Sequence, residues 1–533
     1  MPISFRSGPA ETDFACQDHD RPIDPARVLK RLLNPILAFL CVLAIAVSLW
    51  HLHATTAGLE VRHISIGETP ATVYRLTPDR PAPVVVIAHG FAGSQQLMQP
   101  FAATFARAGY IAVTFDFLGH GRNPRPLGGS ITEIDGATRW LAAQTAEVVA
   151  YARPLGDGRL AILGHSMASD IVVRVAQADP KIAATIAVSM FSPAVTADTP
   201  RNLLVIAGQW EGMLKAEALR AVGLSISPEA AVAGTTYGDF AAGTARRATF
   251  SPYAEHISIL YKQASMAEAL AWLDQTFGVT RPGAPYLDAR GPWIVLLLAG
   301  IVVLARPLSS LLPVVARRSA GAGLRWRQLF PVLLVPTIAT PLLLRVLPTH
   351  FLPVLVADYL AVHFLVYGLL TACGLALLHR RAAPSGTSVP RLLAASAAVT
   401  FYAVGLLFWA IDSNFTSFLP SPGRVTLLAA MLIGTLAFFL STEWLTRGEQ
   451  AARGGYVAAK FAFIVSLAIA VALDFERLFF LIIIVPLIVV FFVVYGLISD
   501  WVYRRTRHPL VAGIASAIAF AWAIGVTFPL LAG

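Results

Sequence analysis

A serine set between small residues, at residues 164–168 (GHSMA), is the feature of this chain that most directly indicates chemistry. A short apolar run leads into it, so the sequence predicts a strand followed by a tight turn. The pattern is close to Gly-x-Ser-x-Gly, in which the serine sits on a strained turn between strand and helix and small neighbours let the backbones pass. Ala168 stands where that pattern has its last glycine. Since five residues also match by chance, the surrounding elements decide whether Ser166 is a nucleophile.

The elements around Ser166 predict a parallel sheet covered by helices. Short β-branched runs indicate buried strands at 83–88, 111–115, 184–188 and 203–207. A helical pattern at 137–152 lies between the second of these and the serine strand. This alternation favours an α/β fold with a mostly parallel sheet and helices on both faces.

Residues 60–278 resemble the α/β-hydrolase family. The resemblance rests on the serine turn, on the HGF loop at 89–91 and on the D-x-x-G-H-G-R stretch at 116–122. The family's chain order of nucleophile, acid and histidine implies Ser166, Glu211 and His256. Glu211 lies three residues after Gly208, at the spacing of the family's acid, where most members carry aspartate. Asp198 and Asp239 also lie between serine and histidine, and Asp239 is the alternative acid.

The resemblance implies nucleophilic catalysis through an acyl-enzyme. A serine hydroxyl needs an imidazole to take its proton, and a carboxylate must orient that imidazole. His256 would be the base and Glu211 its orienting group. The backbone N–H groups of Phe91 and Met167 would hold the oxyanion, each such donor being worth about 3 kcal/mol in comparable enzymes. The loops are supported by a further set of residues: His89, Gly90, Gly164 and His165.

Each of these roles has a structural alternative. Ser166 could be an ordinary small residue at a turn, and His256 a surface histidine. The other histidines nearby precede or adjoin the serine, where the family does not place its base: they are His89, His120 and His165. Only about a dozen residues separate the strand ending near 189 from the strand at 203, so we expect no lid and an open site. Residues 223–243, rich in small residues, are the candidate flank of the substrate entrance.

The second half of the chain predicts a membrane domain. Hydrophobic residues make up 56% of the chain and charged residues only 14%. Runs of about 20 apolar residues can cross a hydrocarbon core of about 30 Å. Eight such runs lie at 292–315, 329–347, 352–378, 392–411, 425–442, 456–473, 478–499 and 510–531, and a ninth at 36–52 precedes the hydrolase-like region.

Basic residues predict the orientation of these spans. Arg27, Lys30 and Arg31 precede the first span, which favours a cytoplasmic N-terminus and a hydrolase domain outside the cytoplasmic membrane. Most later arginines fall in alternate loops, which agrees: Arg317, Arg318, Arg325, Arg327, Arg380, Arg381, Arg391, Arg447, Arg453, Arg504, Arg505 and Arg507. A cleaved signal peptide, with Thr55 and Ala57 near its end, is the alternative reading of the first span.

The sequence thus predicts five segments, which are a cytoplasmic tail at 1–31, an anchor helix at 32–56, an extracytoplasmic hydrolase domain at 59–278, a linker at 279–291 and a membrane domain at 292–533. The net charge of +10 arises in the membrane half, because acidic and basic residues balance within 59–290. The positive charge therefore indicates topology and not a nucleic-acid partner. No cluster of metal-ligand residues is present, so we expect neither metal nor cofactor.

The predicted function is that of a multi-pass membrane serine hydrolase that cleaves an ester, with a lipid or lipid-linked molecule as candidate substrate and the bilayer as partner. The sequence carries no signal for an oligomeric state. The order of anchor, outward hydrolase and many spans is similar to that of eukaryotic GPI-inositol deacylases, by analogy of architecture only. Two other hypotheses are a transporter or lipid-handling protein, with Asp358 and His363 as a polar membrane site, and a non-catalytic hydrolase fold that binds a ligand.

Overall fold

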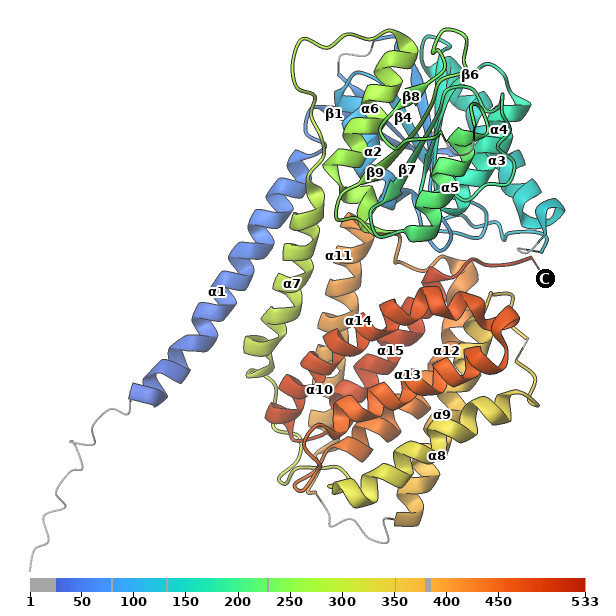
Figure 1. Cartoon of the computed structure of the whole chain (residues 1–533). Helices are drawn as coiled ribbons and strands as arrows, with labels where there is room; N and C mark the ends of the chain where they lie inside the picture. The colour runs from blue at the N-terminus through green and yellow to red at the C-terminus, as the bar shows by residue number, and fades with distance from the viewer. Residues whose placement is uncertain are drawn as a thin grey trace, which may run out of the picture.

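The computed structural model describes residues 25–77, 80–130, 133–227, 230–349, 351–378 and 385–532. Figure 1 shows an α/β part standing at one end of a helical bundle. Two long helices, α1 (Pro25–Ala54) and α7 (Arg290–Ser309), run side by side from the α/β part towards the far end of the bundle. The chain enters the α/β part at the end of α1 and leaves it at the start of α7.

The described residues of the α/β part form a nine-stranded sheet in the order β1-β2-β4-β3-β5-β6-β7-β9-β8. The strands are β1 (Leu59–Ile66), β2 (Thr69–Leu76), β3 (Val84–Ala88), β4 (Ile111–Phe115), β5 (Leu160–His165), β6 (Ile182–Val188), β7 (Leu203–Gly208), β8 (Thr236–Tyr237) and β9 (Arg246–Ser251). Strands from β4 to β9 pair in parallel, and β1, β2 and β8 are antiparallel to their neighbours. This topology confirms the predicted α/β class with a mostly parallel sheet.

Helices cover both faces of this sheet. On one face, α2 (Gln99–Arg107) and α6 (Gln263–Phe277) pack over Val85 and Ile87. On the other, α3 (Arg139–Ala152) and α4 (Met167–Ala178) pack over Val84 and Val86, and α5 (Gly212–Gly223) packs farther along. Neighbouring strand residues point to opposite faces. Burial on both faces explains why β3 is an unbroken apolar run.

The edges of the sheet were not predicted from the sequence. In β1 and β2, polar residues interrupt the apolar pattern, and β9 contains Arg246 and Arg247. Within the segment 223–243, β8 pairs with β9 and closes one edge of the sheet. That pairing gives this part of the segment a structural role.

Nine helices of the described chain are long and apolar enough to cross a membrane. After α1 and α7 they are α8 (Trp326–Leu344), α9 (Ala357–Leu378), α10 with α11 (Val389–Asn414), α12 (Val425–Thr446), α13 (Gly455–Leu473), α14 (Phe475–Thr506) and α15 (Leu510–Thr527). Each coincides, within a few residues, with an apolar run singled out in the sequence. These helices are consistent with a multi-pass membrane protein.

The arginine-rich loops of the bundle gather at the end away from the α/β part. Backbone N–H groups of Ala316 and Arg317 donate to the carbonyls of Thr506 and Ser385, and Gly323 N–H donates to Arg447. These hydrogen bonds join four alternate connections, which follow α7, α9, α12 and α14. The described arginines of these loops therefore share one side of the bundle, and Arg380 and Arg381 lie outside the described residues.

The carboxyl edge of the sheet rests on the opposite side of the bundle. In the loop after β3, the hydroxyl of Ser94 lies 2.9 Å from that of Thr416. In the loop after β4, Arg122 pairs with Asp412 at 2.6 Å, and the carbonyl of Gly119 accepts a hydrogen bond from buried Arg424 at 2.7 Å. Parallel strands end at one edge, so the loop after β5, which carries Ser166, lies on this same edge.

Candidate active site

Ser166 occupies a strained turn between β5 and α4. Its φ is 55° and its ψ is −119°, a backbone conformation that residues with a side chain rarely adopt. A Cβ on Gly164 would lie 2.4 Å from the carbonyl of Ala168, and one on Gly90 would lie 3.0 Å from the Cβ of Ser166. Both glycines are therefore required by close approach. Ala168 is fully buried, and its methyl group fits where the pattern has glycine.

Three loops bring Ser166, His256 and Glu211 into one line. The Oγ of Ser166 lies 2.8 Å from Nε2 of His256. On the other side of the ring, Nδ1 lies 2.6 Å from Oε1 of Glu211. The loops follow β5, β9 and β7, and they meet because these strands are parallel and near one another in the sheet. The residue types and distances are those of a nucleophile, a base and an orienting carboxylate.

Glu211 is held by more than the histidine. Its Oε2 accepts hydrogen bonds from the N–H of Gly208 at 2.6 Å and from the hydroxyl of Ser189 at 2.8 Å. Burial disfavours the charged carboxylate, but the bonds from His256, Gly208 and Ser189 outweigh it and leave the pKa of Glu211 below its usual value. Glu211 is thus anionic, and Nδ1 of His256 carries the proton between them.

The alternative carboxylate lies elsewhere. Asp239 accepts a hydrogen bond from the N–H of Ala242 at 2.7 Å and closes an exposed turn between β8 and β9. Of the two acids considered from the sequence, Glu211 is the one in contact with His256.

Met167 and Phe91, whose backbone N–H groups the resemblance assigns to the oxyanion, both lie in turns close to the serine. Met167 is the first residue of α4, where N–H groups have no partner within the helix and the dipole is positive. Phe91 lies in the loop after β3, next to Gly90, which packs against Ser166. The carbonyl of Gly90 accepts the N–H of Gly93, so this loop is a closed turn.

Three other histidines are fully buried around this loop system. Nε2 of His89 accepts the N–H of Phe117 at 3.1 Å, so its Nδ1–H donates to the carbonyl of Gly90 at 2.8 Å. His165 bonds to the carbonyl of His256, and His120 to that of Leu118. Burial lowers the pKa of His89 to about 4 and those of His120 and His165 to about 3. These neutral side chains order the loops.

Two further residues support the site. Ser189, with φ 51°, follows β6 and bonds Glu211. Asp116, the first residue of the D-x-x-G-H-G-R stretch, accepts the backbone N–H groups of Gln95 and Arg122 and so links the loops after β3 and β4. No local pattern marks Ser189, because its role depends on β6 and β7 lying together.

The serine and the histidine are accessible. Ser166 is partly exposed, and 40% of the His256 side chain is exposed, as expected without a lid. Around them, loops at the carboxyl edge present five exposed apolar side chains, here called the apolar rim: Phe191, Trp210, Met213, Tyr253 and Ile257. Exposed aromatic groups gathered at one edge indicate an interaction surface.

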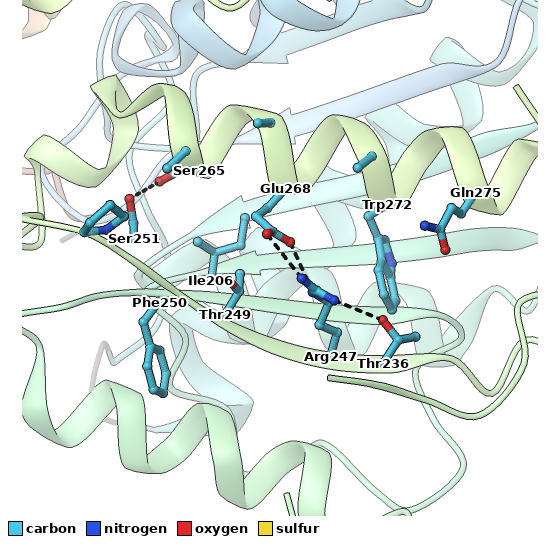
Figure 2. Close-up of a pocket in the computed structure, with 14 residues that line it drawn as sticks. Ile206, Thr236, Arg247, Thr249, Phe250, Ser251, Ser265, Glu268, Trp272 and Gln275 are labelled. Carbon is cyan, nitrogen blue, oxygen red and sulfur yellow. Dashed lines mark hydrogen bonds and ion pairs between the residues drawn. The ribbon is translucent and has the colours of Figure 1, made fainter. Parts of the chain in front are cut away.

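A separate groove of about 480 Å³ runs between β9 and α6. In Figure 2 its charged group, Arg247, reaches Glu268 and Thr236, at 3.1 Å and 3.3 Å. Ser166, His256 and Glu211 do not line this groove. The two charged side chains that line this groove, Arg247 and Glu268, are paired with each other.

The polar residues considered for a membrane site lie in α9. Asp358 accepts the N–H of Tyr359 at 2.8 Å and of Phe351 at 3.2 Å, so it caps the start of the helix. His363 is buried and lies 3.0 Å from the hydroxyl of Ser466. Asp358 and His363 each have a hydrogen-bond partner within the helical bundle.

Sheet order, serine turn and chain order together define an α/β-hydrolase domain, followed by a region of long apolar helices. Residues 79–231 match the family model described as serine aminopeptidase, S33. This match ends before His256, and it covers the serine turn and Glu211.

The chain is also similar to individual proteins. It is 30% identical over 139 residues to the quorum-quenching protein AidA of Acinetobacter baumannii (strain MDR-ZJ06), which covers 25% of this chain and 43% of that protein. The chain thus spans less than half the length of this curated relative.

Among solved structures, a predicted CIB-like hydrolase from Thermoplasma acidophilum has 15% identity and a TM-score of 0.32, covering 40% of this chain and 97% of that one. A dienelactone hydrolase from Anabaena variabilis ATCC 29413 has 15% identity and a TM-score of 0.29, covering 42% and 98%. These likenesses carry no argument about the reaction.

Proposed function

We propose that this protein is a membrane serine hydrolase that cleaves a carboxylic ester by an acyl-enzyme route on the extracytoplasmic side of the cytoplasmic membrane. The observation that carries the proposal is the alignment of Ser166, His256 and Glu211, at 2.8 Å and 2.6 Å. A serine on a strained, partly exposed turn, with its hydroxyl on an imidazole that a buried carboxylate orients, is arranged for nucleophilic attack.

The reaction follows from these positions. The Oγ of Ser166 attacks the ester carbonyl while Nε2 of His256 takes its proton. The oxyanion accepts hydrogen bonds from the N–H groups of Phe91 and Met167. His256 then returns the proton to the leaving alcohol, and an acyl-serine remains. Water attacks this ester with His256 again as base, and the carboxylic acid leaves as Ser166 regains its proton.

The apolar rim supports a lipid or lipid-linked ester as the substrate. Its residues follow β6, β7 and β9, at the carboxyl edge whose other loops contact the bundle, while α1 and α7 tether the domain at both ends. Amphipathic rings such as those of Trp210 and Tyr253 favour the interface between water and lipid. Tethering also raises the effective concentration of a membrane-bound substrate at the site.

The placement of basic residues supports the extracytoplasmic side. The arginine-rich loops lie at the end of the bundle remote from the α/β part. Because loops rich in Lys and Arg are retained in the cytoplasm, the hydrolase domain is expected on the other side of the membrane.

A fluorophosphonate probe tests the proposal, because it reacts only with an activated serine. The purified full chain should be labelled, and Ser166→Ala and His256→Ala should lose labelling. Ser225→Ala is the matched control, since Ser225 hydroxyl bonds the carbonyl of Val222 in another part of the fold. A well-folded wild-type chain that takes no label would contradict the hydrolase and favour a binding module.

A further inference from the structure

Two loops that carry groups of the proposed reaction also contact the helical bundle. In the loop after β3, the ring of Phe91 lies 5.0 Å from that of Phe480 in α14. In the segment after His256, the ring of Tyr261 stacks at 6.0 Å on that of Phe415, which directly follows α11. Phe415 packs against the core of the hydrolase domain, and Tyr261 packs against the core of the bundle. The two parts of the chain therefore interlock beside the site.

The peptide between Gly90 and Phe91 is the part of the first loop that the reaction would use. Its carbonyl accepts the Nδ1–H of His89 at 2.8 Å and the N–H of Gly93 at 3.1 Å. A peptide unit is planar and this one is trans, so its N–H points away from its carbonyl. The hydrolase domain thus holds the carbonyl side of this peptide, and the aim of the Phe91 N–H depends on where the rest of Phe91 is held.

The ring of Phe91 contacts one ring from each part of the molecule. In the hydrolase domain, His120 lies 5.9 Å from Phe91 in an edge-to-face arrangement at 81°. In the bundle, Phe480 lies 5.0 Å from Phe91 at 40°. Both separations are within the range that aromatic pairs prefer. Phe480 is therefore the contribution of the membrane helices to holding Phe91.

The other ring, His120, is held through its backbone by Arg424 of the bundle. The guanidinium of Arg424 is buried and donates to the carbonyls of Gly525 and Phe528 in the bundle and to that of Gly119, each at 2.7 Å. Gly119 directly precedes His120 and has a φ of 73°, which glycine adopts without strain. A buried guanidinium is costly to separate from its acceptors, so these hydrogen bonds resist displacement. The bundle thus fixes the backbone from which the His120 ring projects.

We propose that the helical bundle positions the oxyanion loop of the hydrolase domain, with Phe480 acting through Phe91 and Arg424 acting through Gly119 and His120. Both are positioning residues, because they act on the aim of the Phe91 N–H and not on the substrate. This inference rests on the proposed hydrolase function. It adds a role for the membrane helices in stabilising the oxyanion, beyond anchoring the domain.

A pair of esters tests this role. Full-length protein in nanodiscs is given p-nitrophenyl butyrate or its thiono analogue, in which sulfur replaces the carbonyl oxygen. Sulfur is a weak hydrogen-bond acceptor, so a misplaced Phe91 N–H slows the oxygen ester more than the thiono ester. Complete removal of one oxyanion donor costs about 10²–10³ in kcat. For the partial displacement in Phe480→Ala or Arg424→Met, we expect kcat for the oxygen ester to fall about tenfold, with KM and the thiono rate within about twofold of wild type.

Two matched variants are the controls. Phe475→Ala removes an exposed ring of α14 that lies 5.7 Å from that of Phe479. Arg447→Met removes a guanidinium that pairs with Asp500 at 3.2 Å, at the end of the bundle away from the hydrolase domain. Both should keep the wild-type ratio between the two esters.

Phe480→Ala covers the case in which Arg424→Met fails to fold, because it leaves the charges of the bundle in place. An unchanged ester ratio in folded Phe480→Ala overturns the inference. An equal fall with both esters also overturns it, since that result shows a general distortion of the site. Either result leaves the hydrolase standing. If the wild type reacts with neither ester nor fluorophosphonate, the proposed function itself fails.

Discussion

At the scale of single residues, the site combines Ser166, whose backbone is strained, with Glu211, whose carboxylate accepts three hydrogen bonds. Glutamate reaches farther than aspartate by one methylene, and three hydrogen bonds keep the carboxylate of Glu211 facing His256. The stabilised charge fixes the protonated Nδ1 of the ring, which frees Nε2 to accept a proton from Ser166. The departure from the family's aspartate therefore keeps the arrangement that the reaction needs.

Replacing the acid should test its role. Glu211→Gln keeps the size of the side chain but removes its charge and offers a donor to Nδ1, which favours the wrong tautomer. We expect kcat to fall by about 10⁴, as for comparable triads. Asp239→Asn, in an exposed turn, should retain wild-type kcat with a soluble ester. If the two variants behave in the opposite way, Asp239 is the acid.

The buried histidines should make the domain sensitive to acid. His89, His120 and His165 have pKa values of about 4, 3 and 3 in the folded chain. The unfolded chain binds these protons near pH 6.5, so the stabilising contribution is present above pH 6.5 and is lost as the pH falls towards 4. Each histidine should cost about 2 kcal/mol of unfolding free energy between pH 7 and pH 5.

Urea unfolding of the solubilised chain, followed by near-ultraviolet circular dichroism at both pH values, measures this loss. His120→Asn should reduce the difference between pH 7 and pH 5 by about 2 kcal/mol. His63→Asn, at an exposed position of β1, is the control. An equal pH dependence in wild type and His120→Asn would show that His120 is protonated in the folded chain at pH 5.

At the scale of elements, the connection between β5 and α4 sets the position of Ser166, the proposed nucleophile. Strand and helix cross so closely at Gly164 that the carbonyl of Ala168 occupies the place of a side chain. The next strand supports the turn, since the N–H of Ser166 donates to the carbonyl of Val188. The position of the hydroxyl is thus set by packing between neighbouring elements.

Gly164→Ala should therefore damage both stability and catalysis. The added methyl would lie 2.4 Å from the carbonyl of Ala168, and relieving that overlap should cost about 1–3 kcal/mol. Thermal unfolding and fluorophosphonate labelling measure the two effects. Gly212→Ala is the matched control, because a Cβ there meets no atom within 4 Å. If Gly164→Ala unfolds at the same temperature as the wild type, α4 can move away from the added methyl group without loss of stability.

At the scale of the whole molecule, the hydrolase domain contacts the helical bundle through the carboxyl edge of its sheet. A buried guanidinium, Arg424, bonds the carbonyls of Gly525 and Phe528 in the bundle and that of Gly119 in the hydrolase domain. Such a charge is costly to bury unless its donors are satisfied. This contact is therefore specific, and it places the edge of the sheet that carries Ser166 on the bundle.

Orientation across the membrane can be measured directly. In a background with Cys16, Cys41 and Cys373 replaced by serine, Glu68→Cys lies in the hydrolase domain and Arg453→Cys in an arginine-rich loop. A membrane-impermeant maleimide should label the first in sealed cells and the second only after permeabilisation. The reverse pattern would put the hydrolase domain in the cytoplasm and contradict the proposed location.

The sequence by itself determined the class of the fold and the main candidates of the site. Central strands such as β3 and β7 are buried on both faces, so they read as continuous apolar runs. Ser166 carries a local motif, and His256 follows from chain order. The membrane helices were also readable, because crossing a bilayer demands long uncharged runs.

Only the tertiary structure decided which distant groups meet. The spacing after Gly208 favoured Glu211 but left Asp239 open, and only the contact of Glu211 with His256 distinguishes them, because β7 lies beside β9 and the turn of Asp239 lies elsewhere. The edge strands escaped prediction because polar residues interrupt their apolar pattern.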